Sequence, residues 1–148
     1  MEFVHEITAF LENKPGRLAK ICSALAHEKV DLRALSVMDT NGRSVLRFVT
    51  DHVEETRKVL TSLGTEFLSN EVLAVEMENR PGALARLLER LAEEHINVEY
   101  AYTSASSAPS RSLGIFHTSN PKRAQQILNE APANGSAHSP GRRPLHSR

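Results

Sequence analysis

The hydrophobic positions of this chain follow a helical period in two stretches. Each stretch places apolar residues at i, i+3, i+4 and i+7, the spacing that forms one buried stripe along a helix. The two stripes consist of Leu18, Ile21, Cys22 and Leu25, and of Leu84, Leu87, Leu88 and Leu91. Charged residues lie off both stripes. The pattern therefore predicts two amphipathic helices, each packed on a core.

Short apolar runs around these stripes predict strands. The predicted strands are residues 3–10, 31–38, 44–50, 66–69, 72–77, 97–103 and 112–118, and two further helices are predicted at 53–63 and 121–130. Asn41-Gly42 favours a tight hairpin between the second and third strands. Asn120 followed by Pro121 is typical of a helix start.

The element order repeats because the sequence repeats. Residues 12–37 align with residues 78–103 without gaps, and nine of the 26 positions are identical. The identical positions include those of an Asn-x-Pro-Gly-x-Leu motif that opens each helix. An internal repeat sets the folding unit, so each copy is predicted to have the order βαββα. Residues 66–69 add a last strand to the first copy, and the second copy has no clear counterpart.

This motif, at the first helix of a βαββαβ unit, resembles the ACT domain, a family of small regulatory modules that bind amino acids. The resemblance covers about residues 1–130. It implies an α+β fold of two ferredoxin-like repeats, with antiparallel sheets, helices on one face, and a second repeat that lacks a clear last strand. We expect one ACT-like domain at residues 1–70 and another at 71–130. Residues 131–148 have few apolar side chains and are predicted to be a disordered tail. Whether this tail or another chain completes the second sheet is left open.

The Asn-x-Pro-Gly turn is chemically suited to a free amino acid. A helix N-terminus favours a carboxylate, glycine permits close approach to the backbone, and an asparagine carbonyl can accept a hydrogen bond from an ammonium group. The resemblance adds the start of the second strand as a segment that faces the ligand. The predicted ligand-binding residues are Asn13, Pro15, Gly16, Arg17, Leu18, Asp31 and Leu32 in the first copy, and Asn79, Pro81, Gly82, Ala83, Leu84, Asn97 and Val98 in the second. In the alternative interpretation the turn only joins a strand to a helix.

Composition and charge exclude several classes of function. The 18 basic and 18 acidic residues cancel, so no overall positive field favours nucleic acid. No apolar run approaches the roughly 20 residues that cross a membrane, and the first residues do not resemble a signal peptide. The single cysteine, Cys22, cannot form an internal disulfide. We therefore expect a cytoplasmic protein with no membrane partner.

The motifs of common enzymes and metal sites are missing from the sequence, so we predict no catalytic residue, no metal and no cofactor. The alternative is an acyl-phosphate hydrolase that uses Arg17 and Asn13, but Ala83 at the position equivalent to Arg17 disfavours it. The resemblance implies an amino-acid sensor, expected as a homodimer, that binds its ligand between repeats or chains and acts on a metabolic enzyme or regulator. Two alternatives stay open: a regulatory subunit of an acetohydroxyacid-synthase-like enzyme, and a transcription-linked, amino-acid-responsive regulator. The amino acid and the partner are not identified by the sequence.

Overall fold

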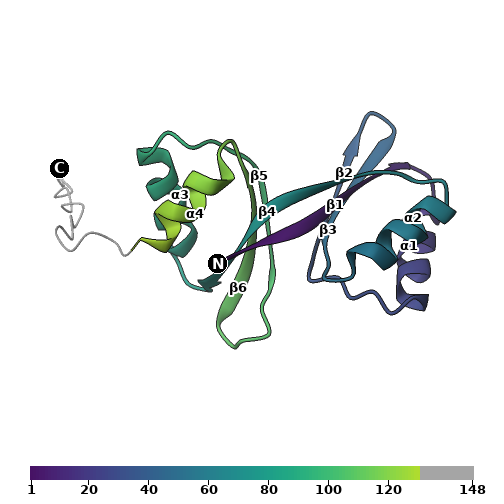
Figure 1. The fold of residues 1–148 in the computed structure, drawn as a ribbon, viewed down its shortest axis with the longest axis horizontal. Helices are drawn as coiled ribbons and strands as arrows, with labels where there is room; N and C mark the ends of the chain where they lie inside the picture. The colour runs from purple at the N-terminus through teal and green to yellow at the C-terminus, as the bar shows by residue number, and fades with distance from the viewer. Residues whose placement is uncertain (131–148) are drawn as a thin grey trace, which may run out of the picture.

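A computed structural model of the chain describes residues 1–130, so the tail predicted for residues 131–148 lies outside the described residues. The elements are β1 (Glu2–Glu12), α1 (Arg17–His27), β2 (Ala34–Thr40), β3 (Arg43–Val49), α2 (Val53–Ser62), β4 (Glu66–Glu78), α3 (Ala83–Glu93), β5 (Val98–Ala105), β6 (Arg111–Thr118) and α4 (Pro121–Asn129) (Figure 1). This succession confirms the predicted tandem α+β fold. The strand β4 ends the first repeat and also begins the second.

All six strands join one antiparallel sheet in the order β2-β3-β1-β4-β6-β5. The long strands β1 and β4 lie side by side at its centre and run in opposite directions (Figure 1). β1 leads toward α1 and α2, and β4 leads back toward α3 and α4. The sheets of the two repeats are therefore continuous. The predicted division between residues 70 and 71 falls inside β4.

The strands β1 and β4 exchange roles between the repeats. In the first repeat, residues 66–70 of β4 pair with residues 6–10 of β1 and form the last strand. In the second repeat, residues 2–5 of β1 pair with residues 71–74 of β4 and take the equivalent place. The offset of 66 residues between the repeats maps the pair His5 and Glu71 onto itself. The two repeats are thus related by an approximate two-fold axis at this pair, and no strand follows α4 within residues 1–130.

Each repeat packs its two helices on one face of the sheet. The first core lies under α1 and α2 around Leu25 and Phe48, which are 1% and 0% exposed. The second lies under α3 and α4 around Leu91 and Phe116, which are each 1% exposed. Burial of one such side chain contributes about 1.5–3 kcal/mol. The predicted arrangement of helices on one face is therefore confirmed in both repeats.

The prediction that Leu18 and Leu84 complete the buried helix stripes is wrong. These side chains are 37% and 43% exposed, whereas Ile21, Leu25, Leu87 and Leu91 are buried. Both exposed leucines lie in the first turn of their helix, directly after the turn that ends a strand. A helical period fixes the angular position of a residue but not how far the sheet extends beneath the helix.

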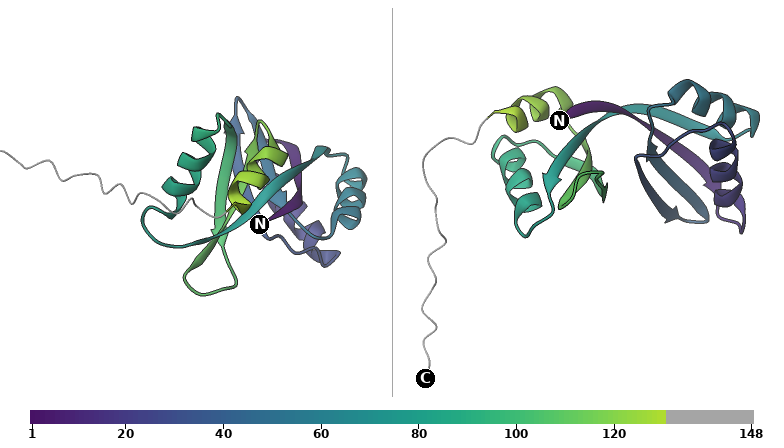
Figure 2. Two further views of the ribbon diagram at one scale, coloured as in Figure 1. Left: turned by 60° about the vertical axis from the view of Figure 1, so that its left-hand side comes forward. Right: turned by 90° about the horizontal axis from the view of Figure 1, so that it is seen from below.

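A third apolar cluster lies on the sheet face opposite the helices and joins the two repeats. Figure 2 shows that the sheet bends, so that the hairpins β2–β3 and β5–β6 project on the same side, away from the helices. The cluster consists of Val4, Ala34, Val49, Val72, Ala74 and Ile115. Because its members come from both repeats, residues 1–130 pack as one body.

Candidate functional site

The two Asn-x-Pro-Gly turns have the same backbone geometry. Gly16 and Gly82 precede α1 and α3 with φ angles of 84° and 86°, a left-handed conformation that glycine adopts at little cost. The Asn13 N–H donates to the Gly42 carbonyl at 3.1 Å, and the Asn79 N–H donates to the Ser110 carbonyl, in the loop after β5, at 2.8 Å. Neither helix start has a side-chain cap. The first N–H groups of both helices therefore have no side-chain acceptor.

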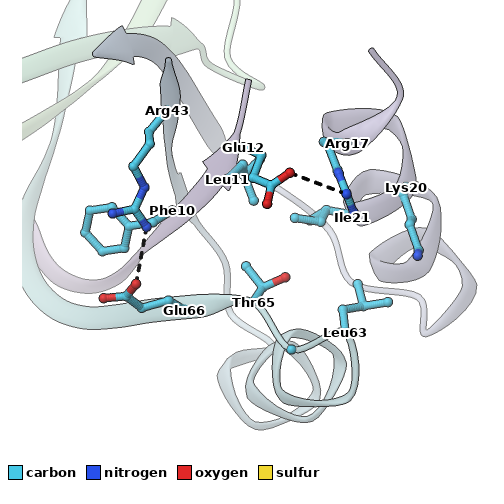
Figure 3. Close-up of a pocket in the computed structure, with 11 residues that line it drawn as sticks. Phe10, Leu11, Glu12, Arg17, Lys20, Ile21, Arg43, Leu63, Thr65 and Glu66 are labelled. Atoms are coloured by element: carbon cyan, nitrogen blue, oxygen red, sulfur yellow. Dashed lines mark hydrogen bonds and ion pairs between the residues drawn. The ribbon is translucent and has the colours of Figure 1, made fainter. Parts of the chain in front are cut away.

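A cavity of about 280 Å³ lies beside the first of these turns (Figure 3). Its walls are the first two turns of α1, the end of β1, the start of β3 and the segment between α2 and β4. Leu11, Ile21 and Leu63 give it apolar lining. The cavity is close to the lower size limit of small-molecule sites, so it suits a small ligand.

Five charged side chains line this cavity. Arg43 donates to Glu66 at 3.3 Å on one side, and Arg17 lies 3.5 Å from Glu12 on the other (Figure 3). Lys20, which also lines the cavity, forms no ion pair within residues 1–130. Exposed ion pairs stabilise a fold weakly. Their charges can therefore be redirected to a ligand at little cost.

The Glu12 carboxylate is held in its ionised form. Its oxygen lies 3.1 Å from the Lys14 ammonium. The hydrogen bond from Lys14, followed by the positive charges of Lys14 and Arg17, lowers the pKa of Glu12 below its ordinary value. The cavity thus combines a stable negative charge with the free positive charge of Lys20.

The second repeat has a cavity of about 310 Å³ at the equivalent place, lined by the end of β4, by α3, and by Met1 and Leu128. Here Ala83 replaces Arg17, and Arg86 replaces Lys20. A Cβ atom on Gly82 would lie 3.0 Å from the Arg86 guanidinium, whereas a Cβ atom on Gly16 would meet nothing within 4 Å. The second turn is therefore partly covered by Arg86, and the first turn is open.

The structure separates the two groups of predicted site residues. Arg17 and Ala83 line the two cavities, and the other residues of both turns are exposed. β1 and β2 are both antiparallel to β3 and run the same way. Asp31 and Leu32 precede β2, so they lie at the opposite end of the strands from Asn13. The same holds for Asn97 and Val98 relative to Asn79 in the second repeat.

Of the eleven residues that line the first cavity, only Arg17 belongs to the sequence-based prediction, and the other ten are absent from it. Lys20 lies three positions after Arg17 on α1, so the helical period could have placed both side chains on the same side of the helix. The Lys20 N–H donates to the Gly16 carbonyl at 2.9 Å. Phe10, Arg43 and Glu66 come from three different strands, and only the register of β1 with β3 and β4 brings them together. No local pattern in the sequence contains that register.

Residues 1–130 were compared with two further kinds of site, for metal and for membrane. No group of three or more His, Cys, Asp or Glu side chains in this part of the chain is arranged to hold a metal ion. No helix in the same part is long and apolar enough to cross a membrane.

Comparison with known proteins gives a family and a fold. A family model described as an ACT domain pair matches residues 2–134. Protein BT0572 from Bacteroides thetaiotaomicron is 28% identical, with a TM-score of 0.79 over 85% of this chain and 86% of that chain. The ligand-free regulatory subunit of aspartate kinase from Thermus thermophilus is 15% identical and has the same fold, with a TM-score of 0.63 over 86% of this chain and 95% of that chain. The corresponding subunit from Thermus flavus is 16% identical, with a TM-score of 0.62 over 86% and 92%. A search of curated proteins gives no match.

Proposed function

The chain belongs to the ACT domain family, and we propose that it is a non-catalytic regulatory protein that binds a small amino acid. The observation that carries this proposal is the cavity at the start of α1. It presents the Lys20 ammonium, the carboxylates of Glu12 and Glu66 and a helix N-terminus around an apolar lining. A zwitterion with a small side chain has the complementary groups.

The charges of the cavity suggest an orientation for the ligand. Lys20 and Arg17 project from the first two turns of α1, where the helix dipole also favours an anion, so the ligand carboxylate is placed there. Glu66 lies across the cavity from them and is placed next to the ligand ammonium (Figure 3). The ligand side chain then lies toward Leu11 and Ile21. Because the cavity holds only about 280 Å³, bulky aromatic amino acids are disfavoured.

We further propose a homodimer formed through β2, an edge strand of the sheet. Leu35 and Val37 of β2 are each 43% exposed, whereas the equivalent positions in the other edge strand are Ala101 and Thr103. An exposed apolar edge strand is suited to pairing with another chain.

This dimer would reunite the two predicted groups of site residues. The Asn13 side chain donates to Asp39 at 3.2 Å, so the first turn lies beside the end of β2. In a two-fold, antiparallel pairing of β2 strands, the start of the partner's β2 would lie beside this same end. Asp31 and Leu32 precede the start of β2. Their copies in the second chain would then approach the Asn13 turn.

The regulated partner is proposed to be a metabolic enzyme or regulator in the cytoplasm. The Thermus proteins that share the fold are regulatory subunits of aspartate kinase. They support a role in which an ACT pair acts on a separate catalytic chain.

Thermal unfolding in the presence of each of the twenty L-amino acids tests the proposed function, because a ligand that binds only the folded state raises the melting temperature. Calorimetric titration then compares Lys20→Ala with Lys122→Ala, a matched loss of an exposed lysine on α4. Loss of a charge-assisted contact to the ligand is expected to weaken binding about tenfold in Lys20→Ala. Lys122→Ala is expected to bind as the wild type does. The proposal fails if no amino acid stabilises the protein, and the assigned cavity is wrong if both variants bind equally.

A further inference from the structure

A second polar cluster lies on the sheet face opposite the helices, between the two repeats. Glu6 of β1 is fully buried. Its carboxylate accepts a hydrogen bond from the Tyr100 hydroxyl and another, at 2.8 Å, from the Tyr102 hydroxyl. Both tyrosines belong to β5 of the second repeat. Since a buried carboxylate is costly unless it is well paired, these two hydroxyls are essential to its placement.

The ring of Tyr100 is held between the repeats. The guanidinium carbon of Arg47, on β3 of the first repeat, lies 4.1 Å from the ring centroid. His117, on β6 of the second repeat, stacks on the Tyr100 ring with centroids 4.8 Å apart. The His117 Nδ1 atom lies 2.6 Å from the Glu99 carboxylate. We call Glu6, Arg47, Tyr100 and Tyr102 the Glu6 cluster.

This cluster has no counterpart on the other side of the approximate two-fold axis. Val72 stands at the position equivalent to Glu6, and Ile115 at the position equivalent to Arg47. Ala34 and Ser36 replace the two tyrosines. One half of the contact between repeats is thus a directional set of hydrogen bonds, and the other half is apolar packing. Hydrogen bonds require a narrow range of distances and angles, so small displacements weaken the first half of this contact.

The Glu6 cluster is connected to the first cavity through two strands. On β1, Glu6 and the cavity residue Phe10 are four positions apart, and on β3 the cavity residue Arg43 and Arg47 are also four apart. Alternate residues of a strand share a face, so each pair lies on one face of its strand. Thr8, which lies between Glu6 and Phe10 on β1, pairs with Arg47 of β3. The Thr8 Oγ1 and Arg47 Nε atoms are buried without a hydrogen-bond partner within residues 1–130. Two polar atoms without a partner weaken the contact between β1 and β3 at this point.

We propose that the Glu6 cluster is a latch between the repeats that is coupled to the occupancy of the first cavity. A ligand that contacts the ends of β1 and β3 displaces Glu6 and Arg47, which hold the tyrosines, and so changes the position of the β5–β6 hairpin. The inference rests on the proposed function for the identity of the ligand. The latch itself can be observed without a ligand. Because coupling between two sites is reciprocal, opening the latch must also change affinity at the cavity.

The chain carries a natural reporter of this latch, because it contains two tyrosines and no tryptophan. Tyrosine emission and near-ultraviolet absorbance of the whole protein therefore report on Tyr100 and Tyr102 alone. The test variant is Tyr102→Phe, which removes one hydroxyl from the cluster. The control is Thr103→Val, which removes a hydroxyl from the exposed face of the same strand.

Amide hydrogen exchange of the unliganded full chain provides the first measurement. Tyr102→Phe is expected to raise exchange at residues 10–12 and 43–47, beside the first cavity, relative to both the wild type and Thr103→Val. A general loss of stability would raise exchange at residues 75–78, beside the second cavity, to the same extent. The latch is overturned if Tyr102→Phe affects both cavities equally or neither of them. If Tyr102→Phe does not fold, Glu6→Gln, which retains the size and one acceptor oxygen, replaces it in the same comparison.

Affinity provides the second measurement, with the amino acid that gives the largest rise in melting temperature in the screen of twenty. Tyr102→Phe is expected to change its affinity at least about fivefold, the lower range of allosteric coupling, and Thr103→Val is expected to leave it unchanged. Binding of that amino acid to the wild type is expected to change tyrosine emission. Unchanged affinity and unchanged emission overturn the latch while the proposed function stands. If no amino acid binds, the proposed function fails and the exchange measurement alone decides the latch.

Discussion

The first repeat places a carboxylate at the centre of the molecule, where the second repeat places a valine. Glu6 and Val72 occupy equivalent positions on the two central strands, and both are almost fully buried. The residues that fix the backbone of the repeats, such as Gly16 and Gly82, are the same and adopt the same conformation. At these positions the duplication retains the glycines that fix the backbone and varies the buried residue at the centre.

The edges of the sheet differ in the same way. The edge strand of the first repeat, β2, exposes Leu35 and Val37 on the face that carries the helices. The edge strand of the second repeat, β5, has Ala101 and Thr103 at these positions. Only the first repeat therefore has an edge suited to apolar association. Its cavity also has the more open turn, so both proposed contacts with other molecules belong to the first repeat.

The largest expected effect on stability comes from replacing Glu6 or Val72, the two residues at the centre, by alanine. Glu6→Ala removes the acceptor of two tyrosine hydroxyls, which are left unpaired between the repeats. Such a loss is expected to reduce the free energy of unfolding by about 3–5 kcal/mol. Val72→Ala removes two methyl groups from an apolar cluster and is expected to cost about 2 kcal/mol.

Urea denaturation of both variants at neutral pH measures this difference. Near-ultraviolet circular dichroism of the folded proteins serves as the control. Glu6→Ala removes the hydrogen bonds of both tyrosines and should alter their signal more than Val72→Ala, which removes only apolar contacts near Tyr102. Equal losses in the two variants would show that the two halves of the contact between repeats are energetically alike. The two halves would then differ in the groups that they contain but not in their contribution to the free energy of unfolding.

The local features of both repeats were predictable from the sequence. The helices α1 and α3 follow from their apolar period, and the turns before them follow from Asn-x-Pro-Gly. The exposure of Leu18 was not predictable, because it depends on where the sheet ends. The single continuous sheet was not predicted either, because β1 contributes its first residues to the second repeat. The sequence shows no clear last strand in that repeat and leaves open whether the tail or another chain completes the sheet, whereas residues 2–5 of β1 take this place in the structure.

The Glu6 cluster shows why the remaining features could not be predicted. Glu6 lies in a strand that contains both apolar and polar residues, and a glutamate there is normally expected to be solvated. Its partner Tyr100 is 94 positions away in the sequence. Neither residue stands out unless the bending of the sheet that brings β5 against β1 is known. Burial of a polar residue is thus a property of the tertiary packing, and the local pattern gives no indication of it.

A smaller effect is expected at alkaline pH and again distinguishes the two halves of the contact. Burial, together with the negative charge of Glu6 and the hydrogen bonds to it, raises the pKa of Tyr100 and of Tyr102 above the ordinary value of about 10. Above about pH 10 the unfolded chain therefore binds fewer protons than the folded protein, and stability falls as pH rises. Below that pH the contribution is fully present.

Urea denaturation between about pH 8 and about pH 11 tests this expectation. The wild type should lose stability over the alkaline part of this range, and Tyr102→Phe should lose less, because one of the two shifted phenols is missing. Phenolate absorbance of the folded wild type should stay low up to the pH at which it unfolds. Titration of both phenols near their ordinary pKa in the folded protein would contradict the buried cluster.

The smallest effect on stability, and the most informative one for the two turns, is expected from the paired variants Asn13→Ala and Asn79→Ala. Both side chains are exposed, and the Asn13 amide makes one exposed hydrogen bond, to Asp39 at 3.2 Å. Each variant should therefore keep its free energy of unfolding within about 0.5 kcal/mol of the wild type.

Their affinities for the amino acid found in the thermal screen should differ. Asn13 borders the open turn of the first repeat, so its loss is expected to weaken binding by roughly ten- to hundredfold. Asn79 borders the turn that Arg86 partly covers, so its loss should weaken binding less. Calorimetric titration of both variants, with melting curves to verify folding, makes the comparison. If Asn13→Ala folds normally and binds as tightly as the wild type, then the Asn-x-Pro-Gly turn only connects a strand to a helix, and the ligand does not touch it.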